Sequence, residues 1–255
     1  MNYLPAIIDI AEQAGQAILA VYQQDNAAFN ITGKADDSPL TAADLAAHQL
    51  IVKALTTLTP ELPILSEEAA DISWDIRQRW QRYWLVDPLD GTKEFIKRNG
   101  EFTVNIALID NGEPVLGVIH APVLAKTYYA AKGEGAFLKQ QTTVIPIKVN
   151  TTSAKQLVKV VGSRSHPSPD LAGYLAQFAQ HEMVPVGSSL KFCLVAEGSA
   201  DVYPRFGPTM QWDTGAGHII ALEAGATVSF DGIASKVYQR ENLRNPNFIV
   251  SAVND

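Results

Sequence analysis

Residues 84–95 read WLVDPLDGTKEF, and the rest of the chain is best understood outward from this stretch. The apolar residues 84–86 predict a short buried strand that stops abruptly at Asp87. Pro88 suits the second position of a tight turn, which would fold the carboxylates of Asp87 and Asp90 toward each other. We therefore expect a strand, a turn and two converging acids.

The paired acids indicate a cation site. Two carboxylates at short range raise each other's pKa unless a positive charge lies between them, and hard oxygen ligands suit Mg²⁺. The same turn could direct the carbonyl of Leu89 at the ion. The alternative is that residues 87–92 form only a polar turn that caps a helix, because Asp, Pro and Gly are common in turns.

Gly91 and Thr92 follow directly and are expected to open a helix. Free backbone N–H groups and the positive end of the helix dipole make such a point attractive to phosphate. Gly91 would allow close approach of the backbone to the anion, and the Thr92 hydroxyl could orient an attacking water.

Two distant segments supply further acids. Residues 65–68 (LSEE) follow an apolar run and bring Glu67 and Glu68 to the end of a neighbouring strand. Residues 211–217 (QWDTGAG) place Asp213 at a predicted helix start, where its alternative role is an N-cap.

Taken together, in this order and spacing, the three motifs resemble the inositol monophosphatase-like superfamily of metal-dependent, lithium-sensitive phosphatases. Residues 187–193 (GSSLKFC) and 201–205 (DVYPR) resemble the CysQ type of 3′(2′),5′-bisphosphate nucleotidase within it. The resemblance implies a layered α-β-α-β-α sandwich of the α+β or α/β class. It also implies hydrolysis of adenosine 3′,5′-bisphosphate (PAP) to AMP and phosphate, in support of sulfur assimilation and PAP recycling.

The resemblance implies two Mg²⁺ sites that share one aspartate, with more ions possible. Glu67, Asp87 and the Leu89 carbonyl would bind the first ion, and Asp87, Asp90 and Asp213 the second. Two ions roughly 3.5–4 Å apart can clamp the attacking and leaving oxygens of an in-line displacement, so no His or Cys nucleophile is required.

Three further residues receive catalytic roles from the same resemblance. Asp44 and Thr92 would activate the water, and Glu68 would touch the metals only through water. Asp44 is spaced from Thr41 as in a capping box, so simple helix capping is the alternative for that pair.

The uncleaved phosphate of the substrate needs cationic or hydroxyl partners. Lys191 and Arg205 are favoured, residues 163–166 (SRSH) are further candidates, and a solvated surface charge is the alternative for each. Gly215 stands where the family often has alanine, which could loosen the helix start after Asp213. The residues expected to contact substrate are Glu67, Leu89, Asp90, Gly91, Thr92, Asp213, Ser188, Lys191 and Arg205.

Composition limits the remaining function classes. The chain has 255 residues, is 47% hydrophobic and carries a formal charge of −7, which excludes a broad electrostatic footprint for polymeric DNA or RNA. Cys193 is the single cysteine, so no internal disulfide can form. The apolar spacing of residues 7–21 predicts an amphipathic helix, and no transmembrane helix or secretory signal is expected. We expect a cytoplasmic protein, with peripheral attachment to the inner membrane and the oligomeric state left open.

Local patterns predict two parts packed as one compact unit. Residues 1–150 are expected to form helices, one running from 42 to about 58, and then an antiparallel meander with a hairpin turn at 110–114. Residues 151–255 are expected to be α/β and more parallel. Their elements are strands at 159–162 and 183–186 and helices at 169–180, 190–197 and 213–224.

Two other functions stay open from the sequence. The first is a phosphatase of the same superfamily that acts on an inositol or sugar phosphate. The second is a non-catalytic regulator that binds a nucleotide or a metal; the presence of every implied ligand together with Thr92 argues against it.

Overall fold

The computed structural model describes residues 3–24, 32–33, 39–163 and 169–254. The helices are α1 (Leu4–Tyr22), α2 (Ala42–Leu58), the 3₁₀ helix η2 (Glu67–Ala69), α3 (Trp74–Arg77), α4 (Thr92–Ile96), α5 (Pro169–Leu175), α6 (Leu190–Ala196) and α7 (Gln211–Glu223). The strands are β1 (Thr32–Gly33), β2 (Pro39–Leu40), β3 (Ile64–Ser66), β4 (Arg82–Asp90), β5 (Thr103–Asp110), β6 (Glu113–Ala121), β7 (Lys126–Ala131), β8 (Gly135–Gln140), β9 (Thr143–Ile147), β10 (Thr152–Ser153), β11 (Leu157–Ser163), β12 (Gln180–Val186), β13 (Val202–Arg205), β14 (Thr227–Phe230), β15 (Phe248–Ser251) and β16 (Val253–Asn254).

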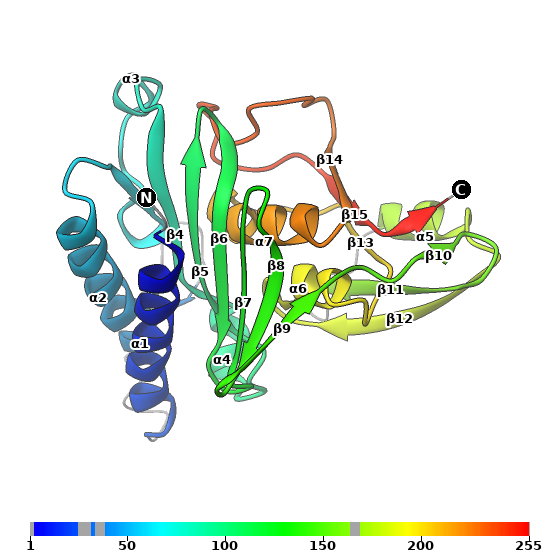
Figure 1. Ribbon diagram of the computed structural model, residues 1–255, viewed down its shortest axis with the longest axis horizontal. Helices are drawn as coiled ribbons and strands as arrows, with labels where there is room; N and C mark the ends of the chain where they lie inside the picture. The colour runs from blue at the N-terminus through cyan, green and yellow to red at the C-terminus, as the bar shows by residue number, and fades with distance from the viewer. Residues whose placement is uncertain (1–2, 25–31, 34–38, 164–168, 255) are drawn as a thin grey trace.

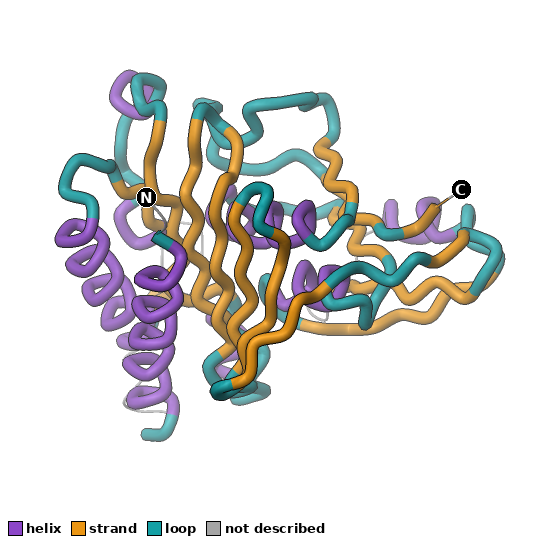
Figure 2. Tube along the Cα trace, in the orientation of Figure 1, coloured by secondary structure: helices purple, strands orange, loops and turns teal. Residues whose placement is uncertain are grey.

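The elements stack in five layers, which confirms the predicted sandwich (Figure 1). Helices α1 and α2 cover one face of a seven-stranded sheet of order β3-β4-β5-β6-β7-β8-β9. Helices α6 and α7 fill the space between that sheet and a five-stranded sheet of order β12-β11-β13-β15-β14, and α5 lies beyond the second sheet (Figure 2).

The outer helical layer forms as its periodicity predicts. Helix α1 buries one apolar face, with Ile7, Ala14 and Ile18 fully enclosed against α2 and the sheet. By length and composition alone α1 could cross a membrane, since its mean hydropathy over 18 residues is 1.3. Core helices of globular proteins meet the same criterion, and α1 packs one face against α2, β5, β6 and β7.

Strand β4 corrects the prediction that a strand stops at Asp87 and a tight turn follows. Asp87 pairs with Asn105 and Asp90 pairs with Thr103. Between these two pairs β4 advances by three residues and β5 by only two. The extra residue is a β-bulge beside Pro88, which has no N–H to give to the ladder. A bulge within a continuing strand, and not a turn after it, therefore sets the directions of the Asp87 and Asp90 side chains.

Helix α7 connects the two halves of the molecule. It packs on β4, β5, β6 and β7, and it carries residues of the largest core cluster, which draws on both halves of the chain. A Cβ placed on Gly215 would lie 2.9 Å from Leu85 Cδ2 and 3.2 Å from Ala107 Cβ. The missing side chain therefore lets the first turns of α7 lie close against the sheet.

The second sheet is mixed, and it contains more parallel pairing than the seven-stranded sheet, as the sequence predicts. Strands β12, β11 and β13 are parallel, whereas β13, β15 and β14 are antiparallel. The last strands are joined by residues 231–247 without a crossover helix, so the chain returns in the opposite direction. Helix α5 ends at Leu175 instead of Gln180, because Gln180 already pairs with Leu157 in the parallel ladder.

A buried histidine under α1 is expected to make the fold acid-sensitive. His120 of β6 is 6% exposed, its Nδ1 lies 2.9 Å from Thr127 Oγ1, and α1 covers its ring at Gly15. Burial lowers the pKa of His120 to about 4, assisted by Lys139 and opposed by Glu12.

We expect the protein to lose stability as pH falls from 6.5 toward 4. The pKa of His120 is lower in the folded protein than the unfolded value of 6.5, so acidification favours the unfolded state. The stability that neutral His120 contributes is therefore complete above pH 6.5. Between pH 7 and pH 5 the free energy of unfolding should fall by about 2 kcal/mol. In urea unfolding, the free energy of unfolding of His120→Gln should fall by about 2 kcal/mol less than that of the wild type over the same pH interval. His181→Gln, at an exposed position, is the control. An equal pH dependence in wild type and His120→Gln would contradict the prediction.

Candidate metal and phosphate site

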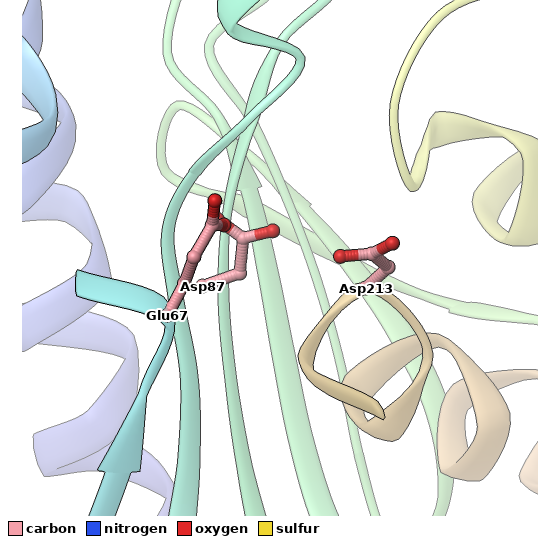
Figure 3. A group of neighbouring side chains, drawn as sticks. All are labelled: Glu67, Asp87 and Asp213. Atoms are coloured by element: carbon pink, nitrogen blue, oxygen red, sulfur yellow. The ribbon is translucent and has the colours of Figure 1, made fainter. Parts of the chain in front are cut away.

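Three acids from distant segments meet at one point. Ligand oxygens of Glu67, Asp87 and Asp213 all lie within 4.8 Å of one another (Figure 3). Glu67 comes from η2, Asp87 from β4 and Asp213 from the first turn of α7. Asp87 is 1% exposed, and the other two are half-buried. The seven-stranded sheet and the middle helical layer thus each contribute to the cluster.

The bulge in β4 holds its own acid in place. The Leu89 N–H donates to Asp87 Oδ1 at 3.1 Å, and the Leu89 carbonyl accepts from Thr92 Oγ1 at 3.4 Å. The side chain of Leu89 is buried in the core formed with α1 and α2. A core anchor therefore fixes the backbone between the two aspartates of β4.

The charge of the cluster fits a bound cation. Burial raises the pKa of Asp213 well above its usual range, and the negative charges of Asp90 and Glu67 add to this effect. The prediction of Asp213 as an N-cap is wrong, because α7 begins at Gln211 and its N-cap is Met210. Asp213 lies in the first turn, where its Oδ2 accepts from the N–H of Met210 at 2.9 Å, so it supports the helix start from within the cluster. A hard divalent ion among these oxygens would relieve the repulsion that burial creates.

Asp90 lies at the end of β4 and is held from the other side of the site. Its Oδ2 accepts from Ser189 Oγ at 2.6 Å and from Asn105 Nδ2 at 3.5 Å. Ser189 Oγ also lies 2.8 Å from the carbonyl of Asp213. Asp90 is not one of the three acids within 4.8 Å, but this serine connects it to the segment that carries Asp213.

Asp44 and Thr92 meet as the sequence predicts. Thr92 Oγ1 donates to Asp44 Oδ1 at 3.2 Å, and Asp44 Oδ2 accepts from the Thr41 N–H at 2.8 Å in a capping box. Capping and the contact with Thr92 therefore coexist. Glu68 lies in η2 beside His48. Burial lowers the pKa of His48, and the negative charge of Glu68 opposes this effect.

Two of the expected substrate residues, Gly91 and Ser188, lie against each other beside the end of β4. Gly91 has φ +96°, a left-handed conformation that favours glycine, and it caps the five-residue helix α4. A Cβ on Gly91 would lie 3.3 Å from the Cβ of Ser188, so the segment before α6 packs directly on the end of β4.

Lys191 is the most buried cation of the region. It is 7% exposed, its Nζ donates to the Ser188 carbonyl, and it lies 5.5 Å from the centre of the Tyr203 ring. Burial lowers the pKa of Lys191 to about 8, opposed by Asp90 and assisted by Arg205. Arg205 donates from Nη2 to the Pro208 carbonyl at 2.9 Å. Residues 164–168 and the Ser163 side chain lie outside the described structure.

A model of the inositol monophosphatase family matches residues 2–247. The chain belongs to this family. Its curated relatives include the protein named 3′(2′),5′-bisphosphate nucleotidase CysQ of Salmonella typhimurium (strain LT2), which is 53% identical over 97% of this chain and 99% of its own length. The protein of the same name from Haemophilus influenzae is 39% identical over 98% of this chain and 92% of its own length.

Solved structures agree with this assignment. CysQ from Bacteroides thetaiotaomicron, described as a bacterial member of the inositol monophosphatase family, superposes with a TM-score of 0.84 at 44% identity. The match covers 97% of this chain and 96% of that one. An inositol monophosphatase (IMPase) from Thermotoga maritima gives a TM-score of 0.75 at 25% identity over 99% and 92% of the two chains.

Sequence reasoning missed two polar residues of the site. It gave no role to Ser189, which contacts Asp90 and Asp213, or to Asn105, which donates to Ser189. The expectation that Ser188 contacts substrate is separate and stays a prediction. Ser188 and Ser189 are adjacent, and the sequence alone does not indicate which of them faces the acids. Asn105 could have been noticed as an amide in an otherwise apolar stretch, residues 104–109.

Proposed function

We propose that the protein is a Mg²⁺-dependent 3′(2′),5′-bisphosphate nucleotidase that hydrolyses PAP to AMP and phosphate. The observation that carries the proposal is the cluster of Glu67, Asp87 and Asp213 beside the Thr92–Asp44 pair. Relatives at 45–53% identity over nearly the whole chain bear the name of this activity. PAP recycling during sulfur assimilation is the role in which such an enzyme would serve.

The acids are suited to two cations. Glu67, Asp87 and the Leu89 carbonyl would hold one Mg²⁺, and Asp87, Asp90 and Asp213 the other. When bound, two such ions neutralise charge on the phosphoryl oxygens and lower the pKa of an attacking water. Glu68 would act on this group only through water.

Thr92 and Asp44 orient the nucleophile in this proposal. The Thr92 hydrogen is directed at Asp44 or the Leu89 carbonyl, so the hydroxyl oxygen is available to accept a hydrogen bond from water. The bond from water oxygen to phosphorus forms as the bond from phosphorus to the ribose 3′ oxygen breaks. The water's proton is released toward the Thr92–Asp44 pair, and the leaving oxygen takes a proton from solvent.

The rest of the substrate would lie toward the second half of the chain. Gly91 and Ser188 lie against each other, and Lys191 and Arg205 supply positive charge for the phosphate that is not cleaved. We propose that residues 1–150 carry most of the metal ligands and that residues 151–255 complete the site with Asp213 and the nucleotide contacts. A cytoplasmic location, with peripheral attachment to the inner membrane as a variant, belongs to the same proposal.

A substrate panel tests the function. Phosphate release should be fastest from PAP or its sulfate-bearing analogue, slower from inositol monophosphate and fructose bisphosphate, dependent on Mg²⁺ and inhibited by lithium. Faster release from inositol monophosphate than from PAP would assign the chain to the other activity of the family. No release from any of the four compounds with Mg²⁺ present would support a non-catalytic protein.

A further inference from the structure

Ser189 lies at a helix N-cap but does not make the hydrogen bond that is usual for a serine there. It is the N-cap of α6, and N-cap serines usually accept a hydrogen bond from a backbone N–H in the first turn. Ser189 makes no such capping bond. Ser189 is 3% exposed, and its Oγ lies 2.6 Å from Asp90 Oδ2.

The hydroxyl is itself held by a buried amide. Asn105 Nδ2 donates to Ser189 Oγ at 2.9 Å, and Thr103 Oγ1 donates to Asn105 Oδ1 at 3.0 Å. Thr103 and Asn105 lie on β5 and are at most 1% exposed. The hydrogen bonds thus form a chain in which Thr103 donates to Asn105, Asn105 donates to Ser189, and Ser189 donates to the carboxylate of Asp90.

One hydroxyl hydrogen must serve two acceptors. Ser189 Oγ lies 2.8 Å from the Asp213 carbonyl as well as 2.6 Å from Asp90 Oδ2, and a serine donates only one hydrogen bond at a time. The shorter distance favours the carboxylate, as expected for an ionised acceptor. Both acceptors belong to residues of the proposed metal site, so either bond ties the start of α6 to that site.

We propose that Ser189, supported by Asn105, is a positioning residue that orients the carboxylate of Asp90 and the first turn of α7 for metal binding. The inference rests on the proposed metal site. Groups that hydrogen-bond to metal ligands typically change metal affinity 10–100-fold when removed. The serine links β4, β5 and α7 at the junction of the two halves, so its loss should loosen ligand geometry without removing a ligand.

Titration of the metal-free protein with Mg²⁺ alone, by isothermal titration calorimetry, tests the inference. Ser189→Ala should weaken binding about tenfold, and Ser189→Thr, which keeps the hydroxyl, should restore most of the affinity. Asn105→Ala leaves the serine in place and should weaken binding in the same direction by a smaller factor. It also carries the test if Ser189→Ala fails to fold.

Thr152 offers a matched control outside the site. Its buried hydroxyl donates to Asp201 Oδ1, so Thr152→Val also removes a bond from a buried hydroxyl to a carboxylate. Thermal unfolding should show lower stability for this variant, with unchanged Mg²⁺ affinity. Wild-type affinity in Ser189→Ala, or an equal loss of affinity in Thr152→Val, would overturn the inference. Absence of Mg²⁺ binding by the wild type would overturn the proposed metal site instead.

Discussion

Asp213→Asn is expected to lower phosphate release from PAP on the order of 1,000-fold and to raise the melting temperature of the metal-free protein. The loss of rate follows from removing one anionic ligand, since metal stabilisation of the transition state is worth several kcal/mol and each 1.36 kcal/mol is tenfold in rate. The gain in stability has a separate cause, which lies in the metal-free cluster.

The cluster is costly when no cation neutralises it. Burial and the charges of Asp90 and Glu67 raise the pKa of Asp213, so its ionised form is disfavoured in the folded protein. Asparagine removes this charge, yet its side-chain oxygen can still accept from the Met210 N–H, as the carboxylate does at 2.9 Å. The capping contact is kept while the repulsion is lost.

Two measurements separate these effects. Phosphate release with saturating Mg²⁺ gives the rate, and calorimetric melting in a chelator gives the stability of the metal-free state. Asp231→Asn, at an exposed turn, is the control and should change neither quantity. A variant with wild-type turnover would remove Asp213 from the metal site, and a lower melting temperature would show that the carboxylate stabilises the fold directly.

The local elements of this fold are largely encoded near each other in the sequence. Thr41 and Asp44 form the capping box that their spacing predicts, and α2 ends at Leu58 as expected. The hairpin at residues 110–114 joins β5 and β6. Such features depend on residues within a few positions of one another, and the hydrophobic pattern then assigns each face to a layer.

Long-range packing decided what the sequence could not. The bulge at Pro88 exists because β4 continues to pair with β5 beyond Asp87, and the early end of α5 follows from pairing of Gln180 with Leu157. The contact of Ser189 with Asp90 depends on where β5 places Asn105, 84 residues earlier in the chain. The three acid motifs could be found from spacing, but their hydrogen-bonding partners could not.

Lys191→Met is expected to raise the KM for PAP about 100-fold, with a much smaller effect on a nucleoside monophosphate. Lys191 is 7% exposed, and methionine keeps most of its apolar stem beside Tyr203 while removing the ammonium group. Truncating one partner of a buried charge pair costs 2–5 kcal/mol, so a phosphate bound by Lys191 should lose affinity to this extent. Lys159→Met, at an exposed position of β11, is the control.

The pH dependence of KM separates a direct role of Lys191 from a structural one. Burial lowers the pKa of Lys191 to about 8, so above this pH the wild type would lose the charge that attracts the second phosphate. The wild-type KM for PAP should therefore rise between pH 8 and pH 9, whereas that of Lys191→Met should stay flat over the same interval. Parallel profiles in the two proteins, or equal effects of the substitution on PAP and on the monophosphate, would place Lys191 outside the nucleotide pocket.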